Sequence, residues 1–163
     1  IPGPWTPEER KRFFDSYLYT EEAFLIDEIV KADKETLTLS ARMETTRHLP
    51  VSRLVVATPD VHPAHVTGAE MIMLTASLGA LHAWFFHGLR WDKGWAGFGS
   101  RIHRADFKAL ATIGPPMRLE SKETRTRTGP KRVVSRYEFE FFQEEKLVYK
   151  SEQSAIFVLN MKA

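Results

Sequence analysis

Residues 67–87, "TGAEMIMLTASLGALHAWFFH", constrain the fold more than any other stretch of the chain. The segment has the length of a helix, and among Asp, Glu, Lys and Arg it contains only Glu70. Its apolar residues fall on every side of a helix instead of forming one stripe, which is typical of a buried helix. Glycine, alanine and serine alternate with the large residues and indicate that other parts of the chain approach closely. The pattern therefore predicts a central helix with a sheet wrapped around it.

The start of this helix follows a recognisable pattern. Thr67, Gly68, Ala69 and Glu70 fit a capping box, in which the threonine accepts from the backbone near Glu70 and the glutamate reaches back. The preceding segment, 48–66, contains three prolines and no sustained periodicity, apart from "RLVVA", which favours a short strand or turn. We therefore expect a helix over 67–87, preceded by a loop over 48–66.

The remaining elements are predicted from periodicity and turn residues. Residues 6–18 favour a helix with Thr6 as N-cap and Pro7 at the first helical position. Apolar and β-branched residues alternate in the two segments that follow, with a turn near Asp33 and Lys34. Strands are predicted over 23–33, 35–47, 95–110, 116–127, 132–145 and 147–160. The connections between the last three are too short for crossovers, so we expect an antiparallel meander.

The order of elements favours one architecture. A helix, two strands, a loop, a long helix and four strands predict an α+β fold in which an antiparallel sheet curls around the long helix. With 163 residues the chain is expected to form a single domain over 1–163, with 1–20 as an N-terminal helical extension. The alternative is an α+β cone, with a helix packed on a curved sheet.

Composition excludes several classes of function. A formal net charge of +2 does not favour a nucleic-acid partner. The chain has no cysteine, which excludes disulfides and thiolate zinc sites and fits a reducing, cytoplasmic location. His62 and His65 have no evident third ligand, so we expect no metal and no separate cofactor. No uninterrupted apolar run predicts a membrane span, and no secretory signal begins at Ile1.

Two segments carry a resemblance to known proteins. "HPAHVTGAEMIML" and "HRADFKALATIGPPMRLE" resemble parts of the β-hydroxyacyl-ACP dehydratases of the hotdog superfamily. "AHVTGAEMIMLTASLGA" is similar to the helix start of the type III fatty-acyl-CoA thioesterases, the FcoT-like branch. The resemblance covers roughly Glu21 to Asn160. It implies a hotdog fold, an acyl group carried by coenzyme A or acyl carrier protein through its phosphopantetheine, and a homodimer or higher homo-oligomer with sites at the interface.

The departures from both families bear on the reaction. The dehydratases have an acidic residue about five positions after the helix glycine, where this chain has Met73. The asparagines and tyrosines of the thioesterase branch correspond to Thr67, Ala76 and Ala80 here. We therefore expect hydrolysis of a fatty acyl thioester. The alternatives are dehydration or hydration of a 3-hydroxyacyl thioester, and a non-catalytic acyl-binding subunit.

The candidate site residues lie around the predicted helix start. His62 and His65 precede a helix N-terminus, where backbone N–H groups stabilise a developing oxyanion, and an imidazole can activate water near neutral pH. Glu70 is a candidate general base or a helix cap, and Asp60 is a further loop carboxylate. The predicted catalytic residues are His62, His65 and Glu70, and the predicted substrate-binding residues are Gly68, Thr67, Met73, Arg125 and Arg127.

Three further groups have two interpretations each. His82 and His87 are five apart, so they are not expected to share a helix face, and each is expected to pack or end the helix. Aromatic residues after position 83 could line an acyl tunnel, although a core role is more common; they are Trp84, Phe85, Phe86, Trp91, Trp95 and Phe98. A basic hairpin over 122–132 is either solvated or attracts phosphates of coenzyme A or the acidic face of a carrier protein.

Overall fold

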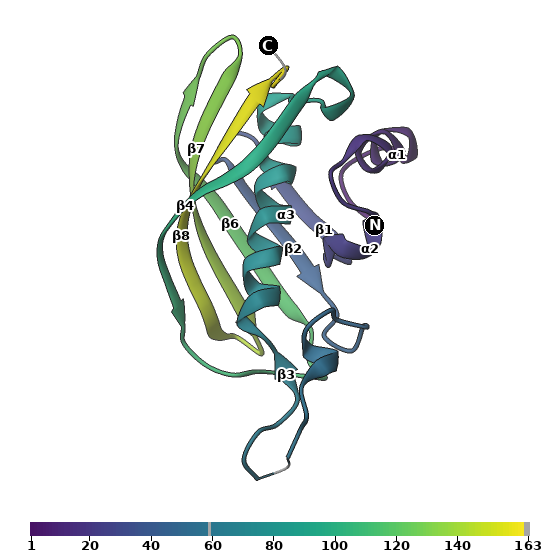
Figure 1. The fold of residues 1–163 in the computed structure, drawn as a ribbon, viewed down its shortest axis with the longest axis vertical. Helices are drawn as coiled ribbons and strands as arrows, with labels where there is room; N and C mark the ends of the chain where they lie inside the picture. The colour runs from purple at the N-terminus through teal and green to yellow at the C-terminus, as the bar shows by residue number, and fades with distance from the viewer. Residues whose placement is uncertain (59, 162–163) are drawn as a thin grey trace.

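The computed structural model describes residues 1–58 and 60–161 (Figure 1). Two N-terminal helices precede a first pair of strands, a long helix follows, and the remaining strands complete the sheet. The elements are α1 Pro7–Ser16, α2 Glu21–Phe24, β1 Glu28–Asp33, β2 Thr38–Met43, β3 His65–Val66, α3 Gly68–His87, β4 Trp95–Phe107, β5 Ala111–Thr112, β6 Met117–Thr128, β7 Arg132–Gln143 and β8 Lys146–Leu159. Short 3-10 turns cover Ser52–Leu54 and Trp91–Lys93.

The main sheet has the strand order β1-β2-β6-β7-β8-β4, and each neighbouring pair is antiparallel. The meander of β6, β7 and β8 confirms the prediction from short connections. The sheet curves along α3, and α1 and α2 lie beside that helix (Figure 1). A two-residue pairing of β3 with β5 closes the end of the molecule at which α3 begins. The predicted α+β fold, with an antiparallel sheet around a long central helix, is confirmed.

The core lies between α3 and the inner face of the sheet. Inward residues alternate along each strand, as a half-buried sheet requires. Leu39, Ala41 and Met43 on β2 are fully buried, and they pack in one cluster with Leu74 and Leu78 of α3. Within the described ranges α3 is long and apolar enough to cross a membrane, but most of it is buried in the fold, as in the core helix of a globular domain.

The N-terminal helix begins as predicted. The Thr6 hydroxyl accepts from the Glu9 backbone at 3.1 Å, Glu9 reaches back to the Thr6 N–H, and Pro7 takes the first helical position. Phe13 of α1 contacts Trp84 of α3 at a centroid distance of 5.1 Å. Aromatic packing therefore fastens the N-terminal extension to the second half of the central helix.

Two local predictions are wrong, and one open alternative is decided. The strand predicted from residue 23 begins only at Glu28, because α2 occupies the preceding residues and ends at Leu25 in the left-handed region. Of the strand or turn expected at "RLVVA", the structure has a 3-10 turn over Ser52–Leu54. The capping box at Thr67 does not form: its hydroxyl donates to the Glu70 carboxylate, and no side chain caps the first turn of α3.

Candidate functional site

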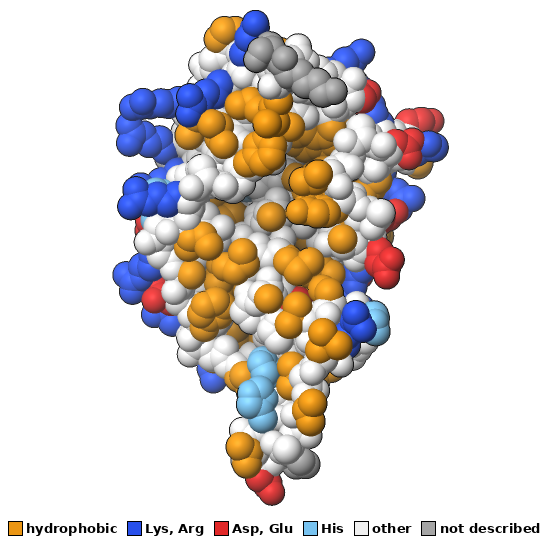
Figure 2. Space-filling model, viewed as in Figure 1, with side chains coloured by type: hydrophobic (Ala, Val, Ile, Leu, Met, Phe, Trp, Pro, Cys, Tyr) orange, Lys and Arg blue, Asp and Glu red, His pale blue; other side chains and the backbone are white. Residues whose placement is uncertain are grey.

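A cavity of about 690 Å³ lies between α3 and the inner side of β4, within the described residues. Its lining is mostly apolar, and Figure 2 shows apolar side chains gathered on this face of the molecule. Pockets of this size and character commonly bind small molecules. Its lining includes Tyr17 and Leu18 beside α1, Trp91, Trp95, Gly97, Phe98 and Gly99 near and along β4, and Tyr137, Phe139, Gln153, Ala155 and Phe157 on β7 and β8.

One face of α3 is open because its side chains are short. Ile72, Thr75, Ala76, Gly79 and Ala80 line the cavity at helical spacing. The helix is therefore not enclosed on all sides, as its all-round apolar sequence suggested. Small residues on this face leave space for a ligand. Of the aromatic residues considered for a tunnel, Trp91, Trp95 and Phe98 line this cavity, whereas Trp84 and Phe86 belong to the core.

Gly68 continues the open face one turn toward the start of α3. A Cβ at this position would lie 2.9 Å from Cε1 of Phe107, so a larger residue at position 68 would displace this exposed ring. The hydroxyl of Thr67 is turned toward Glu70, and no side chain of the described chain caps the first-turn N–H groups. Uncapped N–H groups at a helix N-terminus can bind a carbonyl oxygen that gains negative charge.

Glu70 is fully buried and fastens a loop to the start of α3. Its Oε1 accepts from the Ser52 backbone at 2.5 Å, from the Ser52 hydroxyl at 2.5 Å and from the Val51 backbone at 3.3 Å, and its Oε2 accepts from Thr67. Glu70 does not line the cavity. These hydrogen bonds hold the loop at Val51 and Ser52 against the start of α3. A catalytic role for this carboxylate stays a prediction.

His62 lies on the loop before β3, and His65 is the first residue of that strand. Their ring centroids are 5.3 Å apart, and Nδ1 of His65 contacts the Pro63 carbonyl at 2.8 Å. His62 is exposed and pairs through its backbone with Thr58. Neither imidazole lines the cavity of its own chain. The structure thus brings the two histidines near the start of α3 and leaves both rings without a carboxylate partner in the described chain.

The remaining predicted site residues lie elsewhere. Arg125 and Arg127 belong to the β6–β7 hairpin, at the opposite end of the molecule from Gly68 (Figure 1). Met73 packs against the core and is not part of the cavity lining. Within one chain, the substrate-binding residues predicted from sequence do not form one site, and their roles stay predictions.

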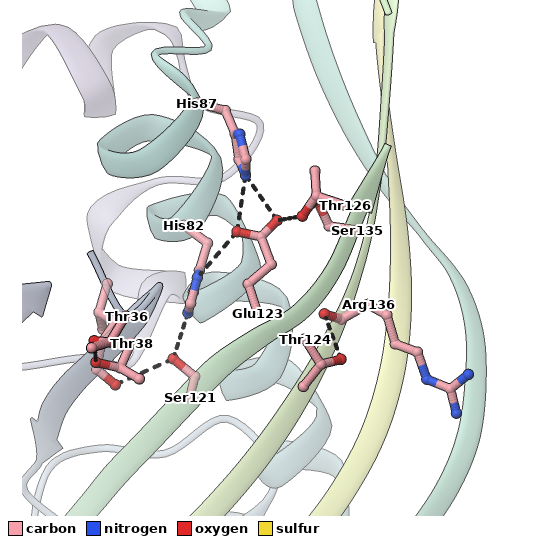
Figure 3. Close-up of polar contacts among 11 residues, drawn as sticks. Thr36, Thr38, His82, His87, Ser121, Glu123, Thr124, Thr126, Ser135 and Arg136 are labelled. Carbon is pink, nitrogen blue, oxygen red and sulfur yellow. Dashed lines mark hydrogen bonds and ion pairs between the residues drawn. The ribbon is translucent and has the colours of Figure 1, made fainter. Parts of the chain in front are cut away.

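A buried polar cluster at the other end of α3 was not anticipated (Figure 3). Both oxygens of Glu123 lie within 2.8 to 2.9 Å of Nε2 of His87, and the Thr126 hydroxyl donates to Oε1 at 2.7 Å. Nδ1 of His82 is 3.8 Å from Oε2 of Glu123. The spacing of His82 and His87 predicted that they would not share a helix face, but both rings turn toward Glu123, which projects from β6 (Figure 3). Their predicted packing roles therefore omit this shared partner.

Burial and hydrogen bonding oppose each other at this cluster. Burial alone would raise the pKa of Glu123, but the nearby His82 ring and hydrogen bonds from His87 and neighbouring hydroxyls bring that pKa well below its usual range. Burial lowers the pKa of His82, against the pull of the Glu123 carboxylate. The cluster therefore favours an ionised glutamate in the folded protein.

Ser121, His82 and Glu123 have the order of a serine–histidine–acid triad, with Nε2 of His82 at 2.8 Å from the Ser121 hydroxyl. Ser121 is buried and donates to the Leu39 carbonyl, and none of the three residues lines the cavity. A nucleophile must reach its substrate, so this arrangement stabilises the fold and is not the reaction centre. The alternation of inward positions along β6 marks residue 123 as buried, and this signal could have identified the cluster.

Thr75 and Gln153 form a second unanticipated pair, inside the cavity. The Thr75 hydroxyl lies 2.6 Å from the Ile72 carbonyl and 3.2 Å from Oε1 of Gln153. Nε2 of Gln153 donates to Tyr149 and to Ser151, both at 3.1 Å. The inward position of Gln153 on β8 was the available signal. The described residues contain no group of three His, Asp or Glu side chains that could hold a metal ion.

Comparison with known proteins places the fold. No protein-family model matches the chain, and no curated protein matches its sequence. A thioesterase from Haemophilus influenzae superposes with a TM-score of 0.61 at 17% identity, over 96% of this chain and 93% of that one. A variant of a Pseudomonas aeruginosa thioesterase gives 0.60 at 13% identity, over 96% and 97%. The E. coli PaaI protein from the phenylacetic acid degradation operon gives 0.54 at 18% identity, over 82% and 84%. The chain therefore has the hotdog fold, as its sequence resemblance implied.

Proposed function

We propose that this protein hydrolyses acyl thioesters of coenzyme A or of an acyl carrier protein. One observation carries the proposal: an apolar cavity and an uncapped helix N-terminus lie on the same face of α3. The cavity can hold an acyl group, and the helix end can hold the carbonyl to which it is attached. The structural likeness to solved thioesterases supports the same reaction class.

The carbonyl site is the first turn of α3. A thioester carbonyl beside Gly68 would accept from backbone N–H groups, and these donors strengthen their interaction as the oxygen becomes negative during attack. The exposed ring of Phe107 lies beside the glycine and would contact a group bound there. The acyl group then extends past Ile72 into the cavity.

Water activation is assigned to the histidine loop. The cavity lining contains no histidine, aspartate or glutamate among the described residues. An imidazole of His62 or His65 can take a proton from water at neutral pH. Because neither ring lines the cavity of its own chain, the proposal requires the loop of a second copy or a shift of the loop on substrate binding.

A homodimer built through β4 is part of the proposal. This outer strand has 13 residues and exposes Phe98, Ile102 and Phe107, whereas the other edge is covered by the N-terminus, with the Ile29 N–H bonded to the Pro2 carbonyl at 2.9 Å. Long apolar sheet edges tend to pair. Antiparallel pairing of two β4 strands about a two-fold axis would bring the partner's β6–β7 hairpin to the end at which α3 begins. Its basic side chains would then lie near the phosphates of coenzyme A or the acidic face of a carrier protein.

Hydrolysis can be tested with acyl-CoA substrates of increasing length, by measuring free coenzyme A and identifying the acid by mass spectrometry. The double variant His62→Ala, His65→Ala should lower kcat by about 10² to 10⁴-fold, the usual contribution of general base catalysis. His48→Ala is the matched control, because His48 is exposed and lies outside both β4 and the cavity lining. An unchanged rate in the double variant would remove the histidines from the mechanism.

A non-catalytic acyl-binding subunit is the second candidate, because the cavity lining of the described chain lacks an acid or base. Binding of acyl-CoA without release of coenzyme A would favour this candidate. Loss of water from a 3-hydroxyacyl-CoA with the thioester intact would instead indicate a dehydratase.

A further inference from the structure

Gln153 places an amide on the inner wall of the cavity. Its Nε2 has two hydrogens and two acceptors, the Tyr149 and Ser151 hydroxyls, each at 3.1 Å. Both N–H groups of this amide therefore donate within the protein, and only Oε1 remains to bond with a ligand.

The Oε1 atom of Gln153 competes with a backbone carbonyl for its hydrogen-bond donor. Among the described residues, its hydrogen-bond partner is the Thr75 hydroxyl at 3.2 Å. That hydroxyl has one hydrogen, and the Ile72 carbonyl lies nearer, at 2.6 Å. If the hydrogen goes to Ile72, Oε1 faces an apolar cavity without a donor, which is a costly state for a polar atom.

The donor that fits this oxygen is a neutral hydroxyl. The cavity lining includes Ala76, Gly79 and Ala155, and its one charged side chain among the described residues is Arg101, a cation that disfavours a second cationic donor. In apolar pockets a few polar groups fix the orientation and identity of the ligand. An acyl group with a hydroxyl at the right depth would supply the missing hydrogen bond.

The depth follows from the helix. Thr75 is seven residues after Gly68, which corresponds to roughly 10 Å along the axis at 1.5 Å per residue. An extended chain advances about 1.2 Å per single bond, so this distance spans about eight bonds. We propose that the cavity selects acyl groups with a hydroxyl about eight bonds from the thioester carbonyl carbon, and that Gln153 Oε1 accepts from it. The inference rests on the proposed function for the position of the thioester.

The test compares octanoyl-CoA, 3-hydroxyoctanoyl-CoA and 8-hydroxyoctanoyl-CoA, using both equilibrium binding and kcat/KM for release of coenzyme A. The 8-hydroxy compound should exceed octanoyl-CoA by about tenfold in both measurements, the value of one net hydrogen bond against a site that water can also occupy. The 3-hydroxy compound should show no such gain. Equal or weaker binding of the 8-hydroxy compound would overturn the inference.

Two variants assign the effect to the amide. Gln153→Leu should reduce the preference for 8-hydroxyoctanoyl-CoA to about one. Thr75→Val removes the nearby hydroxyl and leaves Oε1 to the ligand alone, so the preference should stay or rise, and this variant keeps the test decisive if Gln153→Leu does not fold. Ile72→Val is the control, because it changes the same wall without a polar group and should leave the ratio unchanged. A ratio that falls in Thr75→Val or persists in Gln153→Leu would contradict the assignment.

The two proposals fail in different ways. If no thioester is hydrolysed but the 8-hydroxy compound still binds more tightly in a Gln153-dependent manner, the hydrolase proposal fails and the hydroxyacyl inference stands. If all three thioesters are hydrolysed with equal kcat/KM, the hydrolase proposal stands and the inference fails.

Discussion

A buried carboxylate lies at each end of α3, and the two carboxylates differ in their hydrogen-bond donors. Glu70, at the N-terminal end, accepts from two backbone N–H groups and from the hydroxyls of Ser52 and Thr67. Glu123, at the C-terminal end, accepts from His87 and a hydroxyl, with His82 close by. The first set of donors does not titrate near neutral pH, whereas the second includes imidazoles. The hydrogen bonds of Glu70, beside the proposed site, are therefore expected to be insensitive to pH near neutrality. Those of Glu123, in the core, are expected to depend on pH.

The largest expected effect is at Glu123. Replacement by alanine leaves His87 and Thr126 without their common acceptor inside the core. We expect Glu123→Ala to lower the free energy of unfolding by about 3 to 5 kcal/mol, because each buried group left without a partner costs about 1 to 3 kcal/mol and the side chain's packing is lost as well. Urea unfolding followed by circular dichroism, at one fixed protein concentration, measures this loss. Glu138→Ala, at an exposed position of β7, should change stability by less than about 0.5 kcal/mol. A similar, small loss in both variants would show that the cluster is not formed.

An intermediate effect is expected at the other carboxylate. Glu70→Gln keeps one acceptor oxygen but loses the charge that strengthens its bonds to Ser52 and Thr67. The free energy of unfolding should fall by about 1.5 to 3 kcal/mol, the range for hydrogen bonds to charged groups. Amide exchange at Val51 and Ser52 should accelerate, because these N–H groups bond to this carboxylate. Glu22→Gln, at an exposed position of α2, is the matched control. A loss greater than that of Glu123→Ala would reverse the ranking of the two ends.

The sequence predicted the parts of the fold that local pattern determines. The apolar residues of 67–87 indicated α3, and short polar connections indicated the meander of β6, β7 and β8. Contacts between side chains that are far apart in the sequence could not be predicted from local pattern. The motif at Thr67 and Glu70 is typical of a capping box, but Glu70 instead bonds to Ser52, 18 residues earlier. Alternation identifies which face of a strand is buried, but not which helix residue that face meets.

The same limit applies to the candidate site. The loop histidines and Gly68 were identified because they lie next to each other in the sequence, before a helix. Thr75 and Gln153 are 78 residues apart, and only the register of β8 against α3 brings them together. Arg125 and Arg127 were grouped with Gly68 by residue type alone, and the length of α3 separates them within one chain.

The smallest expected effect concerns pH at the Glu123 end. Burial places the pKa of His82 below its ordinary value of 6.5, so the unfolded chain binds a proton at this residue more readily than the folded chain. Stability therefore falls as the solution is acidified through about pH 6.5. Glu123 acts in the same direction at lower pH: its folded pKa lies below the ordinary 4.5, so its contribution is present above that value and is lost as the pH falls further. We therefore expect the free energy of unfolding to be smaller at pH 5 than at pH 7.

The variant His82→Phe isolates this contribution. Phenylalanine keeps a ring beside Tyr137 and Phe86 but cannot titrate, so the free energy of unfolding should vary less between pH 7 and pH 5 than in the unmodified protein. Urea unfolding at several pH values gives both slopes. A stability that rises on acidification from pH 7 in the unmodified protein, but not in His82→Phe, would mean that His82 gains a proton in the folded state and pairs with Glu123. The attraction of that carboxylate would then exceed the cost of burying the imidazolium, and the C-terminal end of α3 would hold an ion pair between His82 and Glu123.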